Sequence, residues 1–211
     1  MKDQNESGSG AKSNPAARLW ILALAGLISF GAVYVMRGAP DNAAVTDAGA
    51  PKAPEAAAKT GQMAAYVKKK APEALPEISF NDASGKTLSL ADFKGKTILM
   101  NLWATWCAPC REEMGSLNRL QQALGSDKFE VVALSLDRKG AEASQKFLDE
   151  TKATSLKLYI DATAKQGTVL GIVGMPTTIL IDKEGRELGR LAGPAEWDSD
   201  EAKKLIKAAM E

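Results

Sequence analysis

A nearly continuous apolar run from Thr97 to Trp103 lies shortly before Cys107, the first of only two cysteines in the chain. Such a run is typical of a buried strand, because a strand with one exposed face alternates apolar and polar residues. Beyond the second cysteine, Cys110, apolar residues recur at helical spacing: Met114, Leu117, Leu120 and Leu124. A second apolar run, from Phe129 to Leu136, predicts another strand. This strand–helix–strand order predicts an α/β fold with the cysteines at the start of its helix.

The two cysteines form a local motif, Cys107-Ala108-Pro109-Cys110. Free amide groups and the helix dipole favour an anion at a helix N-terminus, so we expect Cys107 to have a lowered pKa and to be the attacking thiol. Cys110, one turn further on, can then attack the mixed disulfide and release the partner. Pro109 stiffens the first helical turn without loss of a hydrogen bond. A disulfide across so short a loop stabilises a fold by only about 2 kcal/mol, which favours redox chemistry over structural cross-linking.

The composition excludes several other kinds of site. Lys and Arg number 27 against 26 Asp and Glu, so the formal net charge is +1 and no global field favours nucleic acid. The chain has no histidine, which removes the commonest metal ligand and the usual acid–base catalyst near neutral pH. We therefore expect neither a metal site nor a bound cofactor, and the redox-active pair itself carries the chemistry.

The N-terminal part predicts a membrane anchor. Residues 1–18 are polar and basic, and Leu19–Met36 then runs for 18 residues without a charge. This run exceeds the roughly 7 to 15 apolar residues of a cleaved signal peptide and is at the short end of a spanning helix. Basic residues precede the span, and only Arg37 directly follows it. The positive-inside rule then places the N-terminus in the cytoplasm and the remainder outside the membrane.

The remainder divides into a tether and a domain. Residues 37–71 are rich in Ala and Pro and predict a flexible tether, with a possible short helix over 55–70 that ends in Lys68-Lys69-Lys70. Residues 72–211 predict the folded domain. Its other expected elements are two short strands around Ser84-Gly85-Lys86, a helix over 141–150, a strand over 156–160, a segment over 164–170, a hairpin of 177–181 with 187–191, and a last helix that carries Ala202, Leu205, Ile206 and Ala209 on one face.

Three features together resemble the thioredoxin superfamily over roughly residues 75–211. They are the motif from Trp103 to Cys110, the later segment Gly174-Met175-Pro176-Thr177-Thr178 and the closing hairpin. The anchor, the extra strands before the motif, an insertion around 137–165 and Gly193-Pro194-Ala195-Glu196-Trp197 make the chain most similar to the TlpA-like membrane-anchored thiol:disulfide interchange proteins. The resemblance implies a thioredoxin-like fold with extra N-terminal strands and a central insertion, preceded by one transmembrane helix.

The same resemblance implies roles for individual residues. Pro176 would form a cis peptide bond facing the cysteines, and the backbone of Met175 would pair with a substrate strand. Trp106, beside the nucleophile, is a candidate for contact with partners, whereas we interpret Trp103 and Trp197 as packing residues. Asn101 stands where thioredoxin has a buried aspartate, which leaves deprotonation of Cys110 without an evident base.

Two glutamates follow the motif closely, Glu112 and Glu113. We interpret both as residues that favour a helix N-terminus, with action on Cys110 through water as the alternative.

The resemblance also implies a physiological setting. The domain would reduce disulfides in the bacterial periplasm, in copper-handling proteins such as a copper chaperone or cytochrome oxidase subunit II. Electrons would come from an inner-membrane donor of the CcdA or DsbD type. Reduction of apocytochrome c during cytochrome c maturation is the alternative task. The absence of a histidine between the cysteines favours a potential nearer to thioredoxin's about −270 mV than to DsbA's about −120 mV.

Other classes of function fit less well. Two cysteines supply half of a tetrahedral zinc set, whereas a Cu(I)-carrying module is compatible with two soft thiolates. A peroxiredoxin-type peroxidase would need Thr or Ser at position 104, which is Ala104 here. A tethered domain with a purely structural role is the remaining alternative.

Overall fold

The computed structural model describes residues 62–211. The predicted cytoplasmic tail, the anchor and the first part of the tether lie outside this range. Between residues 62 and 211, no helix is long and apolar enough to cross a membrane.

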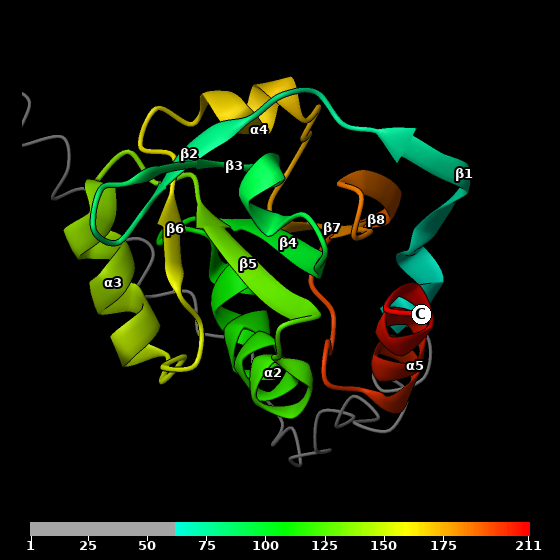
Figure 1. Ribbon diagram of the computed structural model, residues 1–211. Helices are drawn as coiled ribbons and strands as arrows, with labels where there is room; N and C mark the ends of the chain where they lie inside the picture. Colours follow the sequence, from blue (N-terminus) through cyan, green and yellow to red (C-terminus); the bar gives the residue numbers. More distant parts are fainter. Residues whose placement is uncertain (1–61) are drawn as a thin grey trace, which may run out of the picture. The chain divides into compact units, whose positions relative to one another are not determined.

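The described residues form an α/β fold around one mixed sheet (Figure 1). The strand order is β1-β8-β7-β4-β5-β6-β2-β3, which puts β4 and β5 near the middle. The strands are β1 (Val67–Ala74), β2 (Ser79–Asp82), β3 (Thr87–Ser89), β4 (Thr97–Trp103), β5 (Phe129–Ser135), β6 (Leu158–Ile160), β7 (Thr177–Ile181) and β8 (Arg186–Ala192). The α-helices are α2 (Ala108–Leu124), α3 (Gly140–Glu150), α4 (Lys165–Val169) and α5 (Asp200–Ala209), and the 3-10 helices are η1 (Gln62–Ala65) and η2 (Leu90–Phe93).

The parallel part of the sheet places the cysteine motif. Strands β4, β5 and β6 run parallel, joined by crossovers through α2 and α3, while β7 and β8 form an antiparallel hairpin beside β4. Every residue of β4 and of β5 is buried, as expected for central strands covered on both faces. The chain leaves the carboxyl end of β4 and starts α2 within five residues, which puts the motif at the edge of the sheet.

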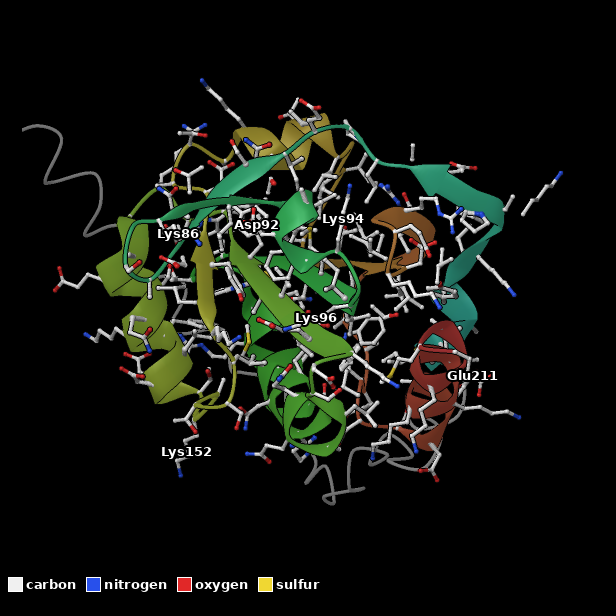
Figure 2. The ribbon with its side chains drawn as sticks, viewed as in Figure 1. Lys86, Asp92, Lys94, Lys96, Lys152 and Glu211 are labelled. Carbon is white, nitrogen blue, oxygen red and sulfur yellow. A yellow bond between two sulfur atoms is a disulfide. The ribbon has the colours of Figure 1, made fainter. Side chains whose placement is uncertain are left out.

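Two hydrophobic clusters cover the two faces of the sheet. Alternate residues of β4 show the division: Leu99 and Trp103 join the cluster with α2, α3 and α5, whereas Ile98, Met100 and Leu102 join the cluster with η2 and the β2 strand. Asn101 shares the face of Leu99 and Trp103 and therefore points toward α2. Charged side chains such as Lys152 and Glu211 are exposed and lie at the periphery (Figure 2).

Most elements expected within the domain are present. The strands around Ser84-Gly85-Lys86, the buried run from Thr97, the helix after the motif, the second strand and the closing hairpin are confirmed, as is the last helix with its buried Ala202 and Ile206. The fold is therefore α/β, with extra strands before the motif.

The prediction of a helix over residues 55–70 is wrong for residues 62–70, the part that the structure describes. Residues 62–65 form a single 3-10 turn, and the lysine run lies in β1, which pairs antiparallel with β8. Met63 is buried in the main hydrophobic cluster, so the folded unit begins before the expected boundary at residue 72. The cause is tertiary, because β1 takes its hydrogen-bonding partner from a strand more than a hundred residues later.

Candidate active site

The two cysteines are joined in a disulfide at the first turn of α2. The Sγ atoms are 2.07 Å apart and the Cα atoms 5.3 Å apart. Cys107 is the N-cap residue, and its Sγ lies 3.3 Å from the backbone nitrogen of Cys110, which donates to it. Cys107 keeps 5% of its surface exposed and Cys110 none, so Cys107 is the more accessible thiol, as expected. Its assignment as the attacking thiol stays a prediction.

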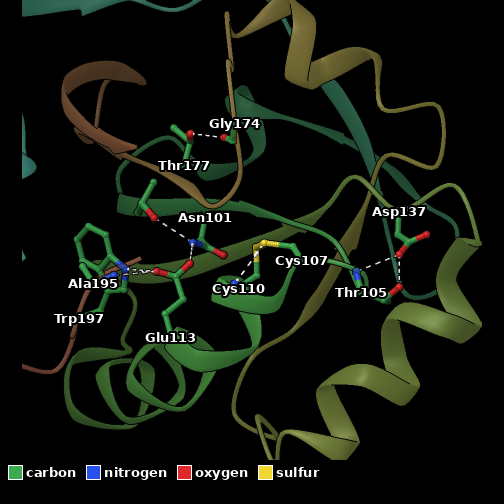
Figure 3. The surroundings of a disulfide bond; sticks show 11 residues. Asn101, Thr105, Cys107, Cys110, Glu113, Asp137, Gly174, Thr177, Ala195 and Trp197 are labelled. Carbon is green, nitrogen blue, oxygen red and sulfur yellow. Dashed lines mark hydrogen bonds between the residues drawn. A yellow bond between two sulfur atoms is a disulfide. The ribbon is translucent and has the colours of Figure 1, made fainter. Parts of the chain in front are cut away.

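Glu113 follows the pair on α2, on the side of Cys110 (Figure 3). Positions three apart share a helix face, so Glu113 is a neighbour of Cys110. Its carboxylate accepts hydrogen bonds from the Asn101 side-chain amide at 2.7 Å, the Trp197 indole nitrogen at 3.1 Å and the Ala195 backbone nitrogen at 3.2 Å. Three donors from two segments of the chain, β4 and the loop before α5, thus converge on one buried acid.

Burial sets the protonation of this acid. Loss of hydration raises the pKa of Glu113 to about 7, and the hydrogen bonds from Asn101, Trp197 and Ala195 only partly oppose this rise. The side chain is 2% exposed, whereas Glu112 faces solvent. Burial and three hydrogen bonds distinguish Glu113 from Glu112, so a preference for the helix N-terminus alone does not account for Glu113, and the alternative that it acts on Cys110 stays a prediction.

Asn101 links this acid to the sheet. Its Nδ2 donates to Glu113 and, at 2.9 Å, to the Thr178 hydroxyl on β7. Its Oδ1 is buried and has no hydrogen-bond partner within residues 62–211. Asn101 itself accepts no proton, but it orients the carboxylate that can.

Trp103 and Trp197 are buried packing residues, as expected, and Trp197 also forms a hydrogen bond. Trp103 stacks on Phe147 of α3 with the ring centroids 4.8 Å apart, and Arg111 lies 4.3 Å above the Phe147 ring. These contacts attach α3 to the start of α2. Trp197 is fully buried, yet its indole nitrogen also donates to Glu113, a role that packing alone did not predict.

The outer side of the pair is more exposed. Trp106 has 66% of its surface exposed, Ala108 is also exposed, and Pro109 is half-buried. The peptide bond between Met175 and Pro176 is cis, as the resemblance implied. The bend before β7 is held by Thr177, whose hydroxyl donates to the Gly174 carbonyl at 2.7 Å.

The sequence was compared with protein-family models and with known proteins. The family model described as Redoxin matches residues 69–206. The chain belongs to the Redoxin family. It is 34% identical to the thiol-disulfide oxidoreductase ResA of Bacillus thuringiensis subsp. konkukian over 121 residues, which are 56% of this chain and 67% of ResA. The thioredoxin-like protein YneN of Bacillus subtilis is 38% identical over 114 residues, 52% of this chain and 64% of YneN.

Solved structures extend the likeness to the fold. A thiol:disulfide interchange protein DsbE from Chlorobium tepidum superposes with a TM-score of 0.59 at 28% identity, covering 66% of this chain and 97% of that protein. The fold of this Redoxin-family chain is therefore thioredoxin-like. With such relatives and a Cys-x-x-Cys pair in disulfide contact, the protein is a thiol–disulfide oxidoreductase. The cysteine pair is its redox group.

A second carboxylate holds the loop that leads to the cysteine pair of this oxidoreductase. Asp137, just after β5, accepts hydrogen bonds from the Thr105 backbone nitrogen at 2.9 Å, from the Thr105 hydroxyl and from the Lys139 backbone nitrogen at 2.8 Å. Burial opposes ionisation, but the bonds from Thr105 and Lys139 outweigh it and hold the pKa of Asp137 below its ordinary value. Sequence reasoning missed this residue, because nothing local distinguishes it from a turn aspartate.

The thiols do not belong to a larger ligand cluster. Within residues 62–211, no group of three or more His, Cys, Asp or Glu side chains could hold a metal ion. The cysteine pair supplies two sulfur ligands, half of a tetrahedral zinc set.

Proposed function

We propose that this oxidoreductase is a membrane-anchored protein disulfide reductase of the bacterial periplasm that acts on copper-handling proteins. One observation carries its thiol–disulfide exchange chemistry: a buried carboxyl group with a pKa of about 7 lies one helical turn beyond the buried cysteine. A carboxyl of ordinary acidity is a weaker base, whereas a pKa near the working pH suits proton exchange with a thiol.

The first step joins enzyme and target. The Cys107 thiolate, favoured at the start of α2, attacks one sulfur of the target's disulfide. The target's sulfur–sulfur bond breaks as the new Cys107–target disulfide forms. The released target sulfur leaves as a thiolate and takes a proton from solvent.

The second step frees the target. Glu113 in its ionised form accepts the proton of the Cys110 thiol, and the resulting thiolate attacks the Sγ of Cys107. The mixed disulfide breaks, the second target sulfur leaves and is protonated, and the Cys107–Cys110 disulfide remains. Two electrons have passed from the enzyme to the target, and the observed disulfide is the oxidised product state.

Repeated turnover needs a reductant for that disulfide. We assign this task to an inner-membrane protein of the CcdA or DsbD type, which would carry electrons from the cytoplasm. The apolar run Leu19–Met36 and its basic N-terminal flank support an anchor that keeps the domain near such a donor.

The choice of target rests on the similarity to TlpA-like proteins. A copper site built from two thiolates cannot accept metal while they form a disulfide, so a reductant has to act first. Deletion of the gene should lower assembled cytochrome oxidase and leave c-type cytochromes intact. Loss of c-type cytochromes instead would favour apocytochrome c as the target.

A direct assay complements the deletion. The reduced full-length protein is mixed with an oxidised copper chaperone, and free thiols are followed over time. The protein should reduce the chaperone faster than a small dithiol does at the same thiol concentration. Equal rates would contradict a specific copper-related task, and copper retained by the purified protein would favour the Cu(I)-carrying alternative.

A further inference from the structure

An open groove of about 710 Å³ lies beside the nucleophile, between the redox loop and the insertion. Its apolar lining includes Trp106, Leu136, Ile172 and Val173. Trp106 is 66% exposed and Val173 is 95% exposed, and large apolar side chains so open to water mark surfaces that bind other molecules when they border a groove. We call this feature the insertion groove.

Basic side chains outnumber acidic ones in the lining of the insertion groove. Its charged lining residues are Asp137, Arg138 and Lys139. The Asp137 carboxylate is already occupied by hydrogen bonds from Thr105 and Lys139. Arg138 and Lys139 are exposed, and their side chains form no salt bridge or hydrogen bond with any residue in the range 62–211. Arg138 is thus a cation without a partner among the described residues, and Lys139, which only the nearby charge of Asp137 attracts, is a second cation on the wall of the groove.

The groove and the nucleophile belong to one connected unit. Trp106, one wall of the groove, directly precedes Cys107 in the chain. Asp137, which also lines the groove, accepts a hydrogen bond from the backbone nitrogen of Thr105 at 2.9 Å (Figure 3). A protein segment whose sulfur is bonded to Cys107 would therefore have its neighbouring residues beside the groove.

We propose that the insertion groove selects protein substrates in which the reactive disulfide is flanked by an apolar side chain and by Asp or Glu. The apolar side chain packs between Trp106 and Val173, and the carboxylate pairs with Arg138 and Lys139. This assignment rests on the proposed function as a protein disulfide reductase and adds the chemical class of the recognised segment. Charge complementarity at a rim acts mainly on the rate of encounter and on the choice of partner.

The test compares three substrates of the reduced full-length protein. Two synthetic peptides share length, one internal disulfide and one leucine, and differ only in flanking Asp residues that are replaced by Asn in the second peptide. The third substrate is bis(2-hydroxyethyl) disulfide, which is uncharged and too small to reach from Cys107 across the groove. We expect the Asp peptide to react about 3- to 10-fold faster than the Asn peptide at low salt, with the difference shrinking as salt screens the charges.

Variants locate the source of the preference. The double substitution Arg138→Ser and Lys139→Ser should remove the preference for the Asp peptide and leave the small disulfide unchanged. The matched control, Lys204→Ser with Lys207→Ser, removes the same charge from exposed positions on α5 and should keep the preference. Val173→Ser should slow both peptides to the same extent without changing the small disulfide.

The outcomes separate the two proposals. Equal rates for the two peptides, or a preference that survives the Arg138/Lys139 substitutions, would overturn the groove assignment while the reductase function stands. A uniform loss on all three substrates in the double variant would also overturn it, since the effect would then lie in the redox pair. A wild-type protein that reduces none of the three disulfides would refute the proposed function itself.

Discussion

The two sides of the cysteine pair differ in nearly every physical respect. On the side of Cys110, Glu113 is buried and surrounded by donors from Asn101, Ala195 and Trp197 (Figure 3). On the side of Cys107, Trp106 is exposed, and the basic side chains of Arg138 and Lys139 face solvent. On the buried side, desolvation makes each charge costly, so we expect this side to control proton transfer. Water screens the charges on the exposed side, so we expect those charges to act mainly on which partner arrives.

The largest expected effects come from replacing each of the two cysteines in a separate variant. Cys107→Ser should abolish exchange and form no mixed disulfide, because we expect the more accessible of the two thiols to start the reaction. Cys110→Ser should accumulate mixed disulfides with its targets, because the buried thiol is needed for release. Non-reducing gels of trapped complexes measure this. Accumulation in Cys107→Ser instead would reverse the assigned roles.

The next effect tests the buried acid. Glu113→Gln keeps the size and shape of the side chain but replaces one accepting oxygen with a donating NH2 group and removes the proton acceptor, so release of the mixed disulfide should slow by about 100-fold. Wild-type release should fall as pH drops below the Glu113 pKa of about 7, and the variant should lose that inflection. Stopped-flow kinetics between pH 5 and 9 decide this. Glu112→Gln, exposed on the same helix, is the control and should leave the profile unchanged.

The same raised pKa predicts a stability effect in the oxidised protein. The folded-state pKa of Glu113 exceeds the ordinary value of 4.5, so its protonated form stabilises the fold fully below about pH 4.5. This contribution is lost as pH rises through about 7 and amounts to about 3 kcal/mol. Denaturant unfolding of wild type and Glu113→Gln at several pH values measures it. An identical pH dependence in both proteins would contradict the burial of the acid.

The smallest expected effect concerns one donor to that acid. Trp197→Phe removes the indole hydrogen bond that lowers the pKa of Glu113, so the kinetic inflection should move upward by about one pH unit. A change confined to stability, with the inflection unmoved, would show that Trp197 only packs. Trp103→Phe, which removes the other buried indole of this cluster, should leave the inflection in place.

Sequence reasoning was most successful where local pattern and tertiary structure agree. The runs that became β4 and β5 are buried on both faces, and the turn before β8 has its glycine, Gly185, at a φ of +88°. Such features follow from side-chain hydrophobicity and turn chemistry within a few residues. The cysteine motif at the start of α2 was predictable for the same reason.

Sequence reasoning failed where a residue's environment comes from distant segments. The lysine run at the start of β1 read as a helix end, because nothing near it indicates the pairing with β8. The pattern likewise did not distinguish Glu113 from Glu112. The groove was missed because Arg138 and Val173 are 35 positions apart and meet only through the fold.

The sequence by itself determined the chemistry of this protein: two thiols, three residues apart, at a strand-to-helix junction, with no histidine and no third cysteine. Only the tertiary structure decided how that chemistry is controlled. Whether a carboxyl group is a surface charge or a buried base depends on its hydration, and the hydration of Glu113 is set by Trp197, 84 positions away. Local pattern cannot specify such a long-range contact, because it forms only when α2, the sheet and the segment before α5 pack together.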